Sequence, residues 1–152
     1  MDTLQDAIDG LHERFATVPG LARYNPAGEL ISIIDHEPSI ELPTPFLFTL
    51  LDGFTSSTEG QITVIIYRFV HALCVLKHDA KYAEREIRPY IESIPQSVER
   101  DIKLGQRISQ GAAWLDAGDR VYRRVGGVIF QAVDFRSTVM IKRGRKRPAG
   151  IG

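Results

Sequence analysis

The chain has 152 residues, of which 43% are hydrophobic and 25% are charged. This length and composition are typical of one soluble domain with its own core, and they exclude collagen-like, disordered and disulfide-scaffold proteins. Basic and acidic residues balance at 19 each, but five of the basic ones lie in residues 142–147, so residues 1–141 carry a net charge of −5. We therefore expect one acidic folded domain over residues 1–141 and a basic C-terminal arm over residues 142–152.

The N-terminal sequence predicts an amphipathic helix over residues 3–17. Its apolar residues recur at spacings of three and four, Thr3 is placed to cap it, and Pro19 ends it. The same segment is acidic and has no apolar stretch of the kind that a signal peptide needs. We therefore expect a protein that is made in the cytoplasm.

A long extended connection is predicted over residues 19–45, because prolines and glycines are frequent there. It contains one short predicted strand, Leu30 to Ile34. Residues 46–51 predict a second strand, which follows two prolines, and the small polar residues 53–60 predict a loop. We expect this loop, and the proline-rich stretch 36–45, to face partner molecules.

The apolar run from Ile62 to Leu76 predicts a long central strand. It is rich in β-branched and aromatic residues, and it is too short to cross a membrane as a helix. A second helix is predicted from His78 to about Ser93, with a further helical turn over residues 95–102.

Two final strands are predicted over residues 108–124 and 128–141, joined by a tight turn at Gly126 and Gly127. Two glycines between extended runs indicate a hairpin, because such a turn requires positive φ. The order of elements predicts an α+β fold, with a mainly antiparallel sheet and helices packed on one face.

No catalytic or cofactor motif is present, so we expect no catalytic residues, no cofactor, no bound metal and no enzymatic activity. The acidic and histidine residues that come nearest to a metal-ligand pattern are interpreted as solvated side chains of loops, strand ends and the polar side of the first helix; they are His12, Asp35, His36, Glu37, His71, His78 and Asp79. The single cysteine, Cys74, lies in an apolar run and is predicted to be a buried, inert thiol.

Several residues are candidates for an interface instead. Arg68 interrupts an apolar strand, so it has a carboxylate partner or faces a sheet edge. Asp134 and Arg136 share one face of the last strand and are candidates for such a pair, either on a solvated sheet face or as an ion pair between subunits. Trp114 is either a core residue or an anchor for a partner. The basic arm suits carboxylates of a neighbouring subunit or the phosphates of DNA, read without sequence preference; its candidate contacts are Arg143, Arg145, Lys146 and Arg147.

A series of segments, in this order, resembles the tail terminator (tail completion, or neck) proteins of long-tailed bacteriophages. The segments are LHERFATVPGL, RYNPAG, PTPFLFTLLDGF, QITVIIYRF leading into HDAKYAEREIRPYI, SVERDI and RVGGVIFQAVDFRSTVMI. The match covers most of residues 4–141, and it is carried by order and spacing rather than by one motif. The extension RGRKRPAGIG lies outside the pattern.

The resemblance implies a structural virion protein without a cofactor or a reaction. Such a subunit forms a homohexameric ring at the tail–neck junction, where it caps the tail tube, stops its polymerisation and joins the tail to the head-completion or connector protein. The expected partners are further copies of the chain, the tail tube protein, the connector and DNA through non-specific contacts, and no membrane. The alternatives are another neck component, such as a head-closure or adaptor protein, and a nucleic-acid-binding adaptor that uses the basic arm.

Overall fold

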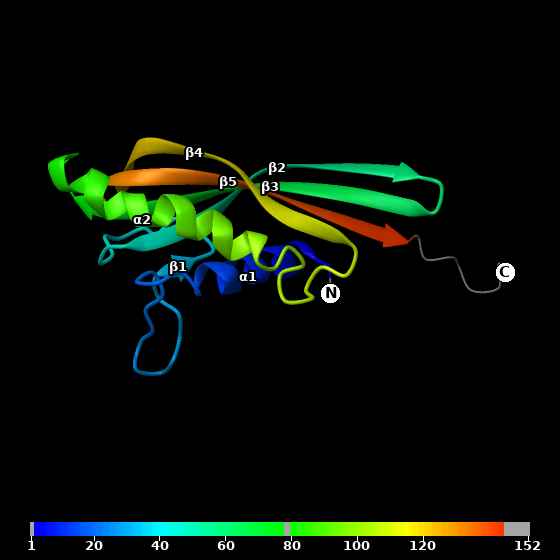
Figure 1. Ribbon diagram of the computed structural model, residues 1–152, viewed down its shortest axis with the longest axis horizontal. Coiled ribbons are helices and arrows are strands. Elements are labelled where there is room, and N and C mark those ends of the chain that lie inside the picture. Colours follow the sequence, from blue (N-terminus) through cyan, green and yellow to red (C-terminus); the bar gives the residue numbers. More distant parts are fainter. Residues whose placement is uncertain (1, 78–79, 145–152) are drawn as a thin grey trace.

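The computed structural model describes residues 2–77 and 80–144, which form two helices and five strands (Figure 1). The elements are α1 (Leu4–Phe15), β1 (Ile33–Ile34), β2 (Phe46–Glu59), β3 (Ile62–Lys77), α2 (Ala80–Glu99), β4 (Gly111–Val125) and β5 (Val128–Gly144). The strands form one sheet in the order β1-β2-β3-β5-β4, in which only the β1–β2 pair is parallel. The predicted α+β class with a mainly antiparallel sheet is confirmed.

The start of α1 carries a reciprocal cap. The Thr3 hydroxyl accepts a hydrogen bond from the Asp6 amide at 3.1 Å, and the Asp6 carboxylate accepts one from the Thr3 amide at 3.0 Å. Two backbone donors that the first turn leaves unpaired are thereby satisfied. The predicted helix and its Thr3 cap are confirmed.

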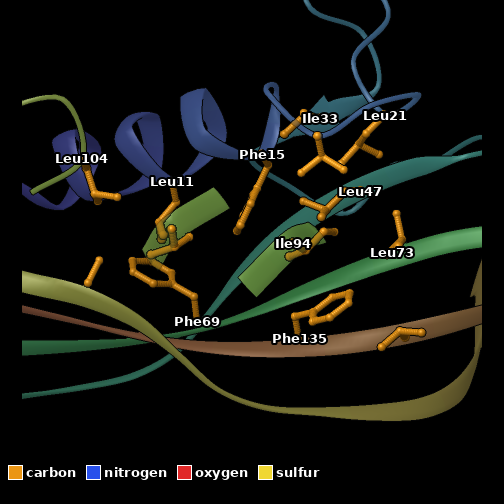
Figure 2. Packing of buried hydrophobic residues seen from close by; sticks show 14 of the residues in the cluster. Leu11, Phe15, Leu21, Ile33, Leu47, Phe69, Leu73, Ile94, Leu104 and Phe135 are labelled. Carbon is orange, nitrogen blue, oxygen red and sulfur yellow. The ribbon is translucent and has the colours of Figure 1, made fainter. Parts of the chain in front are cut away.

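Both helices pack on one face of the sheet, which we call the helix face (Figure 1). The main core lies between them and the strands, and Figure 2 shows its apolar side chains converging from α1, β1, β2, β3, α2 and β5. α1 comes so close to the loop after α2 that a Cβ on Gly10 would lie 2.6 Å from Leu104. Fully buried members of this core include Leu11, Phe15, Leu47, Phe69, Leu73 and Ile94.

The opposite face of the sheet, which we call the outer face, has a second and smaller core at one end. Its buried residues are Phe46, Phe48, Ala72, Cys74, Val125, Phe130 and Ala132. Residues 35–45, which we call the strap, adjoin this cluster: Leu42 packs against it, and Glu41 forms an ion pair with Lys77. The two described helices pack on the helix face, so this smaller core is covered by the strap, which is irregular.

The hairpin between β4 and β5 is confirmed. Gly126 and Gly127 have φ of 58° and 79°, which only glycine adopts readily, and the strands pair from Val125 opposite Val128 onward. β5 runs three residues past Ile141, into the predicted basic arm.

The predicted loop over residues 53–60 is wrong, because β2 continues through Glu59 and turns into β3 at Gly60, where φ is 60°. Its serines and threonines look loop-like by polarity. Threonine is nevertheless a good strand former, and residues 62–68 of β3 supply hydrogen-bonding partners along the whole segment.

Two other boundaries differ from the sequence prediction. The expected separation between a helix ending near Ser93 and a turn over residues 95–102 is wrong, because α2 continues through Pro89 and Pro95 to Glu99. Its buried stripe, which includes Ile87, Ile94 and Val98, packs on the core and compensates for the two missing amide donors. The predicted strand over residues 30–34 is reduced to β1, and the predicted helix start at His78 and Asp79 lies outside the described residues.

Candidate interaction surface

The sheet is much longer than the helices that cover it. β2, β3 and β5 have 14, 16 and 17 residues, so at about 3.3 Å per residue each exceeds 45 Å, whereas the 20 residues of α2 span about 30 Å. One end of the sheet therefore projects past both helices (Figure 1). We call this end the distal sheet; it consists of residues 54–59 of β2, 62–66 of β3 and 142–144 of β5.

The distal sheet carries apolar side chains on both faces. Phe54 is 65% exposed and Ile62 is 50% exposed, and residues 64–66, which are Val, Ile and Ile, are only half-buried. In the described residues, β2 pairs with β1 only as far as Phe48. Beyond Phe48, the edge of β2 that points away from β3 has no neighbouring strand. Apolar residues beside an unpaired strand edge are typical of a surface that another chain covers.

On the outer face, Arg68 and Trp114 lie on either side of Thr138, because both residues are its register partners in the neighbouring strands. Arg68 is exposed and Trp114 is 41% exposed. On its other side, Arg68 faces Gly53, whose missing side chain leaves open space. Arginine and tryptophan together are typical of the anchoring residues of protein interfaces, so we call these two residues the outer-face pair.

The structure places Asp134 and Arg136 in ion pairs within the chain. Arg123 donates two hydrogen bonds to the Asp134 carboxylate, at 3.0 and 2.7 Å, and this bonding raises the pKa of Arg123. Arg136 pairs with Asp119 on the surface. The hypothesis that one of them is paired with Arg68 is not supported by this arrangement, and their role between subunits stays a prediction.

The basic arm is described only at its start. Arg143 lies in β5 and donates a hydrogen bond to the Asp2 carbonyl, so it ties the end of the sheet to the N-terminus. The other candidate contacts of the arm, Arg145, Lys146 and Arg147, lie outside the described residues.

A buried chain of hydrogen bonds joins α1 to three strands. His12 Nε2 is bonded to Thr49 Oγ1 at 2.7 Å, Thr49 Oγ1 to His71 Nδ1 at 2.8 Å, and His71 Nε2 to Ser137 Oγ at 2.7 Å. Burial lowers the pKa of His12 to about 4 and that of His71 to about 3. The interpretation of both histidines as solvated residues is wrong. Because His71 is fully buried, this chain of bonds lies inside the core and ties α1 to the sheet.

The remaining candidates do not converge. Cys74 is buried, as predicted, and burial raises the pKa of its thiol to about 12. His36 pairs with its neighbour Asp35 on the surface at 2.9 Å. Over residues 2–77 and 80–144, no three His, Cys, Asp or Glu side chains are placed to hold a metal ion. Within the same ranges, neither helix combines the length and apolar character that a bilayer crossing requires.

A cavity of about 240 Å³ opens between α2 and β4 on the helix face. It lies at a bulge in β4, where the pairing with β5 shifts between Leu115 and Ala117. Sequence reasoning could not find it, because neither the bulge nor the helix that faces it leaves a motif. Its lining residues are Ile91, Pro95, Leu115, Asp116, Ala117, Gly118 and Phe135.

No protein-family model matches the chain, and no curated protein matches it either.

Proposed function

We propose that this chain is a structural subunit that assembles with further copies of itself into a ring, and that the ring is the tail terminator of a long-tailed phage. In this role the ring sits at the tail–neck junction of the virion, caps the tail tube, stops its growth and binds the head connector. The chain then has no catalytic role. The order of segments from LHERFATVPGL to RVGGVIFQAVDFRSTVMI supports the choice of this family.

The observation that carries the proposal is the distal sheet. A monomer gains nothing from extending three strands past its helices with Phe54 and Ile62 in water, because each exposed apolar side chain forgoes its burial free energy. A subunit of a ring covers such a surface with its neighbours. Permanent interfaces commonly bury more than about 2,000 Å² in total. The projecting strands add surface that can contribute to an interface of this size.

The outer-face pair gives the proposal a second contact region. Arg68 and Trp114 lie level with each other on a sheet face, and the strap covers only the other end of that face. We assign this region to a neighbouring protein of the neck rather than to DNA. Its basic side chains are few, and Arg123 and Arg136 already bind carboxylates of the same chain.

The test is assembly of the purified full chain with the tail tube protein of the same genome. Native mass spectrometry and negative-stain microscopy are expected to show closed rings, six-fold in symmetry, and added chain is expected to end tube growth at a ring. A monomer at every concentration, together with unchanged tube lengths, would refute the proposal. A monomer that binds DNA with a steep salt dependence would favour the nucleic-acid adaptor.

Matched variants separate the surfaces. The double variant Arg68→Ala, Trp114→Ala is expected to fold normally and to lose binding to a neck partner. Tyr24→Ala removes a more exposed aromatic residue that lies outside the named strands, and is expected to keep this binding. If the double variant and Tyr24→Ala bind the neck partner equally well, the outer-face pair is not part of the interface.

A further inference from the structure

We infer that two copies of the chain pair through the open edge of β2, antiparallel and with Ser56 of one copy opposite Ser56 of the other. Residues 53–59 of the two copies then lie side by side, and the two sheets continue into one another. The contact uses the same surface on both copies, so it pairs chains and cannot close a ring by itself. The inference therefore goes beyond the proposed function and does not depend on it.

The backbone groups of Phe54, Ser56 and Thr58 point toward the open edge. At the far side of the sheet, the Ala113 amide donates away from β5, to the Ile102 carbonyl at 2.9 Å. The register partners of Ala113 on the successive strands are Val139, Tyr67 and Phe54. Such a row alternates between pairs that exchange hydrogen bonds and pairs that do not, so Phe54 turns its amide and carbonyl outward. Every second residue does the same, which adds Ser56 and Thr58.

This stretch of edge lacks the side chains that keep strand edges from pairing. Residues 50–59 contain no lysine, arginine or proline, and residues 55–58 are all threonine or serine. The opposite edge of the sheet, on β4, carries Arg120, Arg123 and Arg124, and the first of these binds Glu84 of α2. Charged side chains discourage an edge from pairing, so of these two edges the one on β2 suits another strand.

Two-fold symmetry restricts the register of the pair. Residues that lie opposite each other share a face of the sheet, and side chains alternate between the faces. The axis therefore has to pass through a residue that lies opposite its own copy. With the axis at Ser56, Phe54 lies opposite Thr58 and Thr55 lies opposite Ser57, and no like charges oppose each other. An aromatic residue opposite a β-branched one is a favourable cross-strand pair.

The same register supplies Arg68 with a carboxylate. Arg68 is exposed, and Asp134, the carboxylate considered for it, is bound by Arg123. On β2, Arg68 lies opposite Gly53, where a side chain would meet nothing within 4 Å. Glu59 of the second copy falls opposite Gly53 and on the same face as Arg68. The Cα atoms of Arg68 and Glu59 are then about 9.6 Å apart, two strand spacings, which these two long side chains can span above the glycine.

Registers shifted by one residue lose this ion pair. An axis at Ser57 places Glu59 opposite Thr55, and an axis at Thr55 places it opposite Leu51, next to the bulge in β2. The other carboxylate of the stretch, Asp52, lies in that bulge. In the favoured register it faces the hairpin turn of the second copy and not another carboxylate.

The experiment measures self-association of the full chain by sedimentation equilibrium over a concentration series. Glu59→Lys and Arg68→Glu each bring like charges together above Gly53, and each is expected to weaken pairing by about tenfold or more. The chain that carries both substitutions has opposite charges again, and is expected to recover the wild-type association to within about threefold. Glu29→Lys makes the same charge change at an exposed residue outside the strands and is the matched control. All four proteins are expected to keep the wild-type melting temperature.

A cross-linking arm tests the register. In the proposed pair, Thr55 and Ser57 lie opposite each other at a position without exchanged hydrogen bonds, where the Cα atoms are about 4.5 Å apart and a disulfide can form. Thr55→Cys and Ser57→Cys proteins are oxidised separately and as a mixture, and only the mixture is expected to give a linked dimer. The native Cys74 is buried and serves as an internal control.

The outcomes separate this pairing from the proposed ring. If the wild-type chain associates but both charge variants associate equally well, or if each cysteine protein cross-links to itself as readily as to the other, the pairing is wrong and the proposed function stands. Linked dimers without rings would support the pairing and contradict the ring. A wild-type chain that stays monomeric at every concentration would contradict both.

Discussion

His12 and His71 hydrogen-bond to the same hydroxyl group, the Oγ1 of Thr49, at 2.7 and 2.8 Å. One comes from α1 and the other from β3, so a single threonine on β2 connects the helix to the centre of the sheet. A hydroxyl has one proton to donate, so at most one of the two histidines accepts from Thr49 and the other must donate to it. At least one of the two imidazoles therefore donates to Thr49.

This arrangement predicts loss of stability in mild acid. The folded-state pKa values, about 4 for His12 and about 3 for His71, lie below the ordinary 6.5, so the unfolded chain takes up protons first. The stabilisation is complete above pH 6.5. As pH falls from there toward the folded pKa, the free energy of unfolding drops by about 1.4 kcal/mol per pH unit for each histidine.

Urea titrations from pH 7 to pH 4 measure this slope. The nearest carboxylates, Asp9 and Asp35, act on His12 in the opposite direction and only reduce the effect. His12→Gln is expected to remove about half of the slope between pH 6 and pH 4. An unchanged slope in that variant would mean that His12 is not the titrating group.

Thr49→Val tests the shared hydroxyl. The substitution keeps the side-chain volume and leaves His12 Nε2 and His71 Nδ1 buried without their partner. We expect the protein to lose about 2–4 kcal/mol of stability, since each unpaired buried group costs about 1–3 kcal/mol. Thr58→Val removes an exposed hydroxyl that is bonded to Thr63, and is expected to change stability by less than about 0.5 kcal/mol. Similar losses in both variants would contradict the role of burial.

Removing one member of the Arg123–Asp134 pair is predicted to destabilise the protein, whereas replacing both members by apolar residues is predicted to cost little stability. Asp134→Ala leaves the half-buried guanidinium without its carboxylate, and is expected to cost about 3 kcal/mol. The double variant Arg123→Met, Asp134→Leu is expected to recover most of that loss. Arg136→Ala, which breaks an exposed pair, is expected to stay within about 1 kcal/mol of the wild type in thermal unfolding.

The two glycines of the β4–β5 turn are predicted to be unequal. At Gly127 a side chain would meet open space, so Gly127→Ala is expected to cost only the strain of positive φ, about 1–2 kcal/mol. At Gly126 a Cβ would also lie 2.3 Å from the Glu41 amide nitrogen of the strap. Gly126→Ala is therefore expected to lower the melting temperature at least twice as much. Equal decreases in melting temperature for the two variants would show that the strap moves away from a Cβ at residue 126 at little cost.

Where one local signal decided an element, the sequence was enough to predict it. Thr3 with Asp6, the apolar run from Ile62 to Leu76, and the Gly126–Gly127 turn each specify a cap, a strand or a hairpin without help from distant residues. The prediction failed where tertiary contacts decided. The distal half of β2 is a strand because β3 pairs with it, and α2 passes through Pro89 and Pro95 because the core holds its buried stripe.

The candidate surface was less accessible from sequence. Arg68 and Trp114 were found as anomalies in otherwise apolar or extended runs, but their alignment across Thr138 depends on the register of three strands. Phe54 was hidden inside a predicted loop. The α2–β4 cavity depends on a bulge at Leu115 and Ala117, for which the residues themselves give no signal. The two histidines were misread because helix and strand periodicity do not reveal buried polar partners.

The strap covers one end of the outer face and leaves the other end uncovered. At one end, Leu42 and its neighbours complete a small core around Phe48 and Phe130 within the same chain. At the other end, Arg68 and Trp114 are exposed. Because the strap completes this core within the same chain, that end of the outer face is covered without a partner. The contact that we propose with a neighbouring protein is thereby confined to the other end.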